Sequence, residues 1–387
     1  MENLTAAWNF PTAIQVGEHR AKAIATECVR LGMSAPLFVT DPGLAALPMV
    51  DELLRLCRQG GLNVALFSDI KSNPTGENVA LGVQSFKQGR HDSVIAFGGG
   101  SALDAGKAIA FMADQVQPLW AFEDIADNWT KADSDAIKPV IAIPTTAGTG
   151  SEVGRSSVIT DAQHKVKKII FHPGMTPKLV LLDPVVCVGL PPALTAATGM
   201  DALSHNLEAY CAPFYHPLAE GVAVEGMRLI KEHLLRAYHH GDDLPARTQM
   251  LVASAMGATA FQRGLGGMHA IAHSLGALFD AHHGLLNAIL MPYVLQANCA
   301  VIDERITRLN RYLDLPQSGF DGFLSWVLEM RTALNIPHTL ADIGIDGSQA
   351  ELVAAMSVKD PCAAGNPVGL TQAQYRQLFL AAVDGTL

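Results

Sequence analysis

The chain has 387 residues, of which 49% are hydrophobic and 17% are charged. This composition excludes a disordered protein, and a chain of this length is expected to form two domains, each with a core of its own. The formal net charge is -10, and no run of Lys and Arg occurs that would neutralise a phosphate backbone. Nucleic acid is therefore not an expected partner.

The N-terminal segment carries Glu2 and no basic or apolar stretch of the kind found in a secretion signal. No run of about 18 uninterrupted apolar residues occurs in the chain, so a membrane partner is not expected. The 6 cysteines include no Cys-x-x-Cys pair. Reduced thiols and a cytoplasmic location are the prediction, with a disulfide left open because the number of cysteines is even.

Short apolar runs alternate with helical stretches between Ala35 and Asp183. This alternation predicts a parallel sheet, and the absence of polar residues within the runs predicts helices on both of its faces. Ligands of such sheets bind at the carboxyl ends of the strands. The predicted strands are Pro36–Thr40, Val64–Phe67, Ser93–Phe97, Val140–Ile143 and Leu179–Leu182.

The hydrophobic pattern changes after Asp183-Pro184. From there on nearly every segment is predicted to be a helix, with interruptions at Gly and Pro, as at Met291-Pro292 and Ile336-Pro337. We therefore expect an α/β domain with a Rossmann-like parallel sheet over residues 1–188 and an all-α domain over residues 189–387.

A glycine turn follows the third predicted strand, in the order Gly98, Gly99, Gly100, Ser101, and a helix opens behind it. Glycine lets backbone N–H groups approach an anion, and the N-terminus of a helix adds about half a positive charge. The turn therefore suits a pyrophosphate. It is not the G-x-G-x-x-G pattern, so an ordinary tight turn stays open as the alternative.

A second loop of this character, Pro144–Glu152, follows the fourth predicted strand and offers the hydroxyls of Thr145, Thr146 and Thr149. Its alternative role is to cap the next helix. Asp41 ends the first predicted strand and is placed to accept hydrogen bonds from an adenine ribose, which favours NAD over NADP. As part of Asp41-Pro42-Gly43 it also fits an ordinary turn.

Histidine and aspartate recur at helical spacing in the second half of the chain. Asp201 and His205 lie four residues apart, as do His269 and His273, and the pair His282-His283 follows. These segments are otherwise rich in Ala, Leu, Met and Gly, where unpaired polar groups are costly. One carboxylate and three imidazoles suit Zn2+ or Fe2+. The alternative is that each histidine is a hydrogen-bonded core or surface residue.

These segments together resemble the iron-containing, or group III, alcohol dehydrogenases. The motifs that carry the resemblance are the glycine turn with Asp104, the loop Pro144–Glu152, the segment Pro191–His205, and the segment His269–Gly276. The resemblance spans nearly the whole chain. It implies an NAD-linked dehydrogenase that interconverts a primary alcohol or diol and its aldehyde, with one divalent metal, Fe2+ before Zn2+, and a homodimeric or larger assembly.

The resemblance also implies the site residues. Metal ligands fall on Asp201, His205, His269 and His283, the last chosen over His282 because the family's ligand precedes glycine. His273 matches a catalytic histidine that does not bind the metal. The implied cofactor contacts are Asp41, Gly98, Gly99, Gly100, Ser101, Asp104, Thr145, Thr146, Thr149 and Lys167.

Two departures from the family pattern bear on binding. Gly154 stands where the family commonly has Thr, and Val368 stands where it has the Arg of Asn-Pro-Arg. Two other functions therefore stay open. One is a lyase or cyclase related to dehydroquinate synthase, which would also use NAD and a metal. The other is a catalytically silent NAD-binding assembly protein.

Overall fold

The structure, a computed structural model, describes residues 8–10 and 12–387. The chain divides into two compact units. The first, here called the sheet unit, contains residues 12–146 and Gly150–Gly189. The second, here called the helical unit, contains residues 8–10, Ala147–Thr149 and Leu190–Leu387. The three residues Ala147–Thr149 thus belong to the helical unit, although the residues before and after them belong to the sheet unit.

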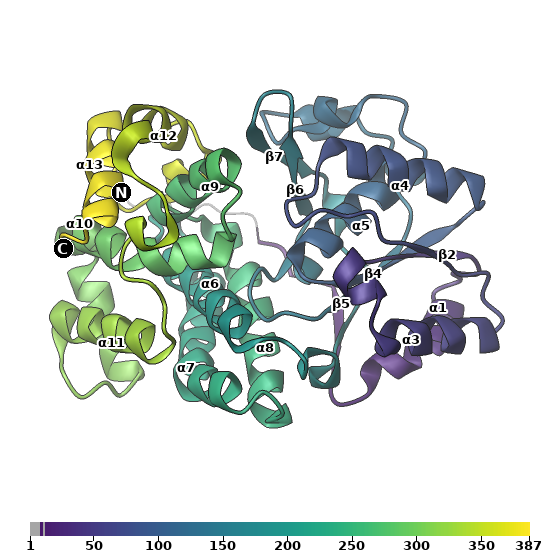
Figure 1. Cartoon of the computed structure of the whole chain (residues 1–387), viewed down its shortest axis with the longest axis horizontal. Helices are drawn as coiled ribbons and strands as arrows, with labels where there is room; N and C mark the ends of the chain where they lie inside the picture. The colour runs from purple at the N-terminus through teal and green to yellow at the C-terminus, as the bar shows by residue number, and fades with distance from the viewer. Residues whose placement is uncertain (1–7, 11) are drawn as a thin grey trace. The chain divides into compact units, whose positions relative to one another are not determined.

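The sheet unit is built on six parallel strands in the order β1-β8-β5-β4-β2-β3 (Figure 1). The predicted parallel sheet is confirmed, and the five predicted strands are found to within one residue at each end. The edge strand β1 was not predicted, because it is short and partly exposed. The strands are β1 Ala13–Val16, β2 Pro36–Val39, β3 Ala65–Phe67, β4 Ser93–Gly98, β5 Val140–Pro144 and β8 Leu179–Leu182.

Helices cover both faces of the sheet, as the continuous apolar strands predicted (Figure 1). Successive side chains of a strand point to opposite faces. In β4, Val94 and Ala96 pack with α4 (Gly76–Gln88) and α5 (Gly100–Met112), whereas Ile95 and Phe97 pack with α1 (Ile24–Arg30) and α3 (Pro48–Gln59). Every strand position in the middle of the sheet is therefore buried.

Two further features of the sheet unit were not predicted. A short helix, α2 (Pro42–Ala45), follows β2. An antiparallel hairpin, β6 (Ser156–Asp161) with β7 (Val166–Phe171), follows the loop after β5. Ile159 and Ile170 of the hairpin are fully buried in the core beside α5.

The helical unit contains no strand among residues 190–387 and folds around one apolar core. Most of α6 is buried, from Thr195 to its last residue. The helices are α6 Pro192–Cys211, α7 Pro217–His239, α8 Leu244–Ala260, α9 Gly267–Phe279, α10 His283–Tyr312, α11 Gly319–Ala333, α12 Ala350–Ser357 and α13 Gln372–Asp384 (Figure 1).

The 30-residue helix α10 differs from the expectation at Pro292. It continues through Pro292, which was expected to interrupt it. Pro292 and its neighbours are buried, so packing stabilises the helix where the proline removes a backbone hydrogen bond. Among the described residues α10 alone has the length and hydropathy of a membrane span, but 67% of its most apolar window is buried, as in the core helix of a soluble protein.

No disulfide joins any of the 6 cysteines, all of which lie in the described part of the chain. Five are buried and Cys299 is partly exposed.

Candidate metal centre

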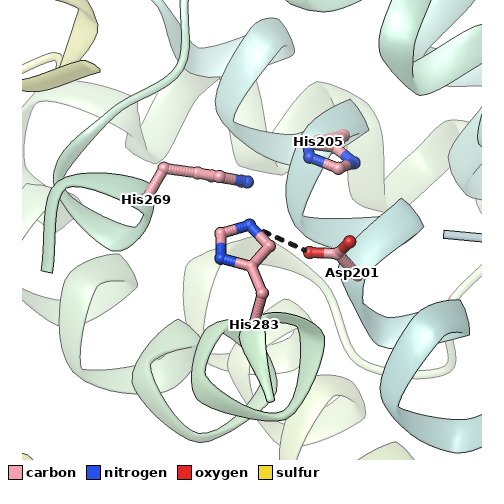
Figure 2. A group of neighbouring side chains, drawn as sticks. All are labelled: Asp201, His205, His269 and His283. Atoms are coloured by element: carbon pink, nitrogen blue, oxygen red, sulfur yellow. Dashed lines mark ion pairs between the residues drawn. The ribbon is translucent and has the colours of Figure 1, made fainter. Parts of the chain in front are cut away.

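Four side chains from three helices of the helical unit point toward one another (Figure 2). Asp201 and His205 come from α6, His269 from α9 and His283 from the first residue of α10. Each offers one ligand atom, and these atoms all lie within 4.8 Å of one another. The structure therefore brings together the four residues that the sequence singled out as metal ligands.

Local sequence explains how the helices deliver these groups. Asp201 and His205 are one helical turn apart and share one face of α6. Gly284, next to His283, packs directly against α6: a Cβ atom on it would lie only 2.5 Å from the carbonyl oxygen of Ala197. Only glycine permits that approach, which leaves His283 Nε2 3.8 Å from Asp201 Oδ1.

The electrostatics of the cluster suit a cation. Asp201, His205 and His269 are buried, and the His205 and His269 rings stack with centroids 4.7 Å apart. Burial, together with the neighbouring His205, holds the pKa of His269 well below its usual range. The His269 ring is thus neutral near pH 7 and keeps a lone pair for a ligand. Three imidazoles and one carboxylate form a donor set that Fe2+ and Zn2+ both accept, so these residues fit such an ion.

The second nitrogen of two of these rings is fixed by a hydrogen-bond acceptor. His269 Nδ1 lies 2.6 Å from Glu208 Oε2, and His205 Nδ1 lies 3.1 Å from the carbonyl oxygen of Gly148. In a neutral ring, an Nδ1–H that donates in this way leaves Nε2 as the nitrogen that can bind an ion. Sequence reasoning missed both acceptors. Glu208 follows His205 by three residues on the same helix, and this spacing could have revealed it as a neighbour of the cluster. The backbone carbonyl of Gly148, by contrast, has no signal in the sequence.

Asn287 is a further member of the cluster that the sequence did not reveal. Its Nδ2 lies 2.8 Å from Asp201 Oδ1, 3.2 Å from His269 Nε2 and 3.1 Å from His283 Nε2. It is one helical turn beyond His283 on α10 and fully buried. The usable signal was again this four-residue spacing.

His273 and His282 lie outside the group of four. His273 stacks on His283 with centroids 5.2 Å apart, and its Nδ1 lies 3.0 Å from Asp360 Oδ2. The side chain of His282 instead accepts a hydrogen bond from Leu285 N at the start of α10. Neighbouring histidines in the sequence therefore have different surroundings, and His273 lies beside the cluster without joining it.

Several of the residues suggested for cofactor binding meet at one edge of the sheet. Asp41, the glycine turn and Thr145 follow β2, β4 and β5, three adjacent parallel strands. Gly98 has a φ of 142°, and a Cβ on it would lie 2.8 Å from Ala102 Cβ and 3.6 Å from Asp41 Oδ2. Thr145 N donates to Gly98 O at 3.0 Å. The structure thus places backbone amides and one carboxylate where parallel sheets bind ligands.

The remaining suggested cofactor residues have partners within the protein. Ser101 Oγ donates to the carbonyl of Ser72, and Lys167 Nζ donates to Asn73 Oδ1 at 2.7 Å. Asp104 accepts from Ser151 Oγ at 2.5 Å and from Val158 N at 2.9 Å, which secures the loop and the hairpin behind the glycine turn.

The suggested loop is divided between the two units. Thr145 and Thr146 belong to the sheet unit, while Thr149 is grouped with the helical unit. Asp41 Oδ1 accepts from Leu44 N at 3.0 Å and so caps α2, leaving Oδ2 as the oxygen nearer to Gly98.

The two departures from the family pattern have different surroundings. A Cβ on Gly154 would make ordinary contacts, 3.5 Å from Ser151 O and 3.6 Å from Lys107 Nζ, so packing does not require glycine there. The carbonyl of Val368 accepts from Asn366 Nδ2 at 2.8 Å, and this bond does not depend on the side chain at position 368. Neither departure disturbs the four converging side chains.

Comparison with known proteins agrees with this geometry. Residues 11–184 match the iron-containing alcohol dehydrogenase family, and residues 195–383 match the C-terminal part of the Fe-containing alcohol dehydrogenase family. The chain is 37% identical to a 4-hydroxybutyrate dehydrogenase of Cupriavidus necator over 380 residues, covering 96% of this chain and 98% of that one. It is 33% identical to an NAD-dependent methanol dehydrogenase of Bacillus methanolicus, covering 97% and 99%.

A solved structure of 1,3-propanediol oxidoreductase superposes with a TM-score of 0.92 at 32% identity, covering 97% of this chain and all of that one. Both halves of the chain are thus matched by one family. The chain belongs to the iron-containing alcohol dehydrogenase family.

Proposed function

We propose that Asp201, His205, His269 and His283 hold the metal ion of this NAD-linked alcohol dehydrogenase. The observation that carries the proposal is the convergence of these four ligand atoms within 4.8 Å in a buried setting. A buried carboxylate and three imidazole nitrogens gathered in this way are costly unless a cation or hydrogen bonds satisfy them. Fe2+ is the expected ion by family membership, and Zn2+ is the alternative that the same donors accept.

An ion held by Asp201, His205, His269 and His283 would supply Lewis-acid polarisation of an alcohol or aldehyde oxygen, and NAD would supply the hydride acceptor. The role of the protein is to hold both groups and to move the proton. His269 and His205 would present Nε2 to the ion, because Glu208 and the Gly148 carbonyl accept from their Nδ1 atoms. His273 is the group proposed to carry the proton released from the alcohol, since it stacks on His283 and is partly exposed.

The cofactor is proposed to bind at the carboxyl edge of the sheet. Backbone amides of Gly98, Gly99, Gly100 and Ser101 would hold the pyrophosphate at the start of α5, and Asp41 would accept from the adenine ribose. Thr145, Thr146 and Thr149 would offer hydroxyls. Asp104 and Lys167 would then act mainly by holding the surrounding segments, given their bonds to Ser151, Val158 and Asn73.

Other parts of the proposal rest on the family alone. The substrate is expected to be a primary alcohol or diol and its aldehyde, by analogy with the hydroxybutyrate, methanol and propanediol enzymes to which the chain is similar. We propose a nicotinamide domain over residues 1–188 and a metal-binding domain over residues 189–387. A cytoplasmic location and a homodimer or larger homo-oligomer are proposed on the same ground. Neither a dehydroquinate synthase-like lyase nor a silent assembly protein is favoured by the relatives.

The test is an activity screen of the metal-free protein reconstituted separately with Fe2+ and Zn2+. Each form is mixed with NAD or NADP and a panel of primary alcohols and diols, and reduced nicotinamide is measured by absorbance. Net NADH formation that depends on the added ion is expected. Elimination or cyclisation without net NADH would support the lyase, and inactivity of every metal-loaded form toward the panel would support the silent protein.

A further inference from the structure

Glu208 is a buried carboxylate next to the cluster but outside the four proposed ligands. It lies on α6 one turn beyond His205 and is 6% exposed. Its two oxygens accept three hydrogen bonds: from Gly266 N at 2.8 Å, from Met268 N at 2.8 Å and from His269 Nδ1 at 2.6 Å. An acidic group in this place needs an explanation, because an apolar side chain would be cheaper to bury.

The three donors all lie at the beginning of α9. The first N–H groups of a helix have no partner within the helix itself. Here Glu208 takes those of Gly266 and Met268, and Asn366 Oδ1 takes that of Gly267 at 3.0 Å. The start of α9 is therefore fixed to α6 by the same carboxylate that contacts His269, which is in the first turn of α9.

The contact with His269 has a direct consequence for the ring. A carboxylate accepts but cannot donate, so His269 must carry its proton on Nδ1, and Nε2 keeps its lone pair. His269 Nε2 is also the nitrogen on the side of the cluster, 3.2 Å from Asn287 Nδ2. Outer carboxylates of this kind orient a histidine and make its free nitrogen a stronger donor.

We propose that Glu208 is a positioning residue of the metal centre, which holds His269 in the Nδ1–H form and sets the affinity for the ion without being a ligand. The inference rests on the proposed metal centre. The competing explanation is that Glu208 only caps α9. A cap would affect the stability of the fold but not the tautomer of the ring or the surroundings of the ion.

Glu208→Gln separates the two roles because it keeps the shape of the side chain. An amide is neutral and has one oxygen, so its nitrogen faces either Met268 N, in place of Oε1, or both Gly266 N and His269 Nδ1, in place of Oε2. In the first orientation His269 keeps its acceptor but loses the negative charge that makes its free nitrogen a stronger donor. In the second orientation the ring must move its proton to Nε2, which removes the lone pair that the ion needs. Asn366→Ala is the matched control, since it removes a bond to the start of α9 from a residue that makes no hydrogen bond to His269.

The experiment uses the full chain and Co2+ as the probe. Competition with a chelator measures the affinity, the visible spectrum of the Co2+ form reports the ligand geometry, and urea unfolding of the metal-free protein reports stability. Glu208→Gln is expected to weaken Co2+ binding by about 10- to 100-fold and to change the spectrum. Asn366→Ala is expected to lower stability while leaving Co2+ affinity and spectrum unchanged.

Equal affinity and an identical spectrum for Glu208→Gln and the wild type would overturn the proposal. A wild type that does not bind Co2+ one to one would instead overturn the metal centre and this inference with it. If Glu208→Gln does not fold, nitrogen NMR of labelled histidine in the metal-free wild type decides. An Nδ1–H signal for His269, assigned by its loss in His269→Ala, supports the proposal, and an Nε2–H signal contradicts it.

Discussion

His205 Nδ1 lies 3.1 Å from the carbonyl oxygen of Gly148, so a loop noticed in the sequence for its hydroxyls and glycines also orients a histidine of the metal centre. Gly148 is separated by one residue from Thr146 and is next to Thr149, both of which are proposed to contact the cofactor. The proposed cofactor loop and the proposed ligand set are thus joined through one backbone carbonyl.

Gly148→Ala is expected to disturb that carbonyl. A Cβ there would lie 2.8 Å from Thr198 Cβ and 2.9 Å from Thr198 O, so the loop must shift. The expected results are a loss of about 1–3 kcal/mol in the free energy of unfolding and about 10-fold weaker metal binding. Urea unfolding and chelator competition measure the two effects. Gly221→Ala on α7 is the control: its Cβ meets nothing within 4 Å, and it should stabilise the helix by about 0.5–1 kcal/mol.

Separate substitutions of the two α9 histidines should distinguish metal binding from proton transfer. His269→Ala is expected to lose metal and activity together, because it removes a proposed ligand. His273→Ala is expected to retain metal and to lower kcat by on the order of 100-fold, since a proton carrier and not a ligand is lost. Metal analysis of the purified variants and steady-state kinetics provide the measurement. Full metal occupancy in His269→Ala would refute the ligand assignment.

Asp41→Ser is expected to change the preference between cofactors. Serine still caps α2 in place of Asp41, which accepts from Leu44 N, but it carries no charge to repel a 2′-phosphate. The predicted result is a loss of about 10-fold or more in kcat/KM with NAD and a gain with NADP, in keeping with the value of hydrogen bonds to a charged group. The comparison is made with the same alcohol and metal. If the ratio of kcat/KM with NAD to kcat/KM with NADP does not change, Asp41 has no role in choosing the cofactor.

Glu152 predicts a distinctive dependence of stability on pH. Burial raises its pKa to about 7, against 4.5 in the unfolded chain, and its oxygens have no hydrogen-bond partner among the described residues. Between pH 4.5 and 7 the unfolded chain releases this proton while the folded chain keeps it, so the contribution of Glu152 to stability falls as pH rises. The total loss is up to about 3 kcal/mol.

Glu152→Gln should remove this pH dependence. Urea unfolding of the metal-free wild type and variant at pH 5 and pH 8 measures it, and the variant should gain stability relative to the wild type at the higher pH. Curves that stay parallel between the two pH values would contradict the shifted pKa. Glu123→Gln is a suitable control, because it removes a partly exposed carboxylate, which lies 3.4 Å from Lys168 Nζ, and leaves the buried Glu152 unchanged.

The local signals in the sequence were sufficient for the parallel sheet and for the candidate ligands. Apolar runs such as Leu179–Leu182 predict buried strands, and the four-residue spacings of Asp201 with His205 and of His269 with His273 place each pair on one face of a helix. Residue type and spacing are properties of the chain itself, so they can be read before folding. The same reading could not separate His269 from His273 without the family resemblance.

The tertiary structure alone decided which distant groups meet. The carboxylate of Glu208 lies against the ring of His269, 61 residues away, and the carbonyl of Gly148 against His205, 57 residues away. Such contacts depend on how α6, α9 and the loop pack, and a backbone carbonyl has no signature in the side-chain pattern. The sequence determines the chemical groups that are available, whereas packing determines which nitrogen of each ring faces the ion.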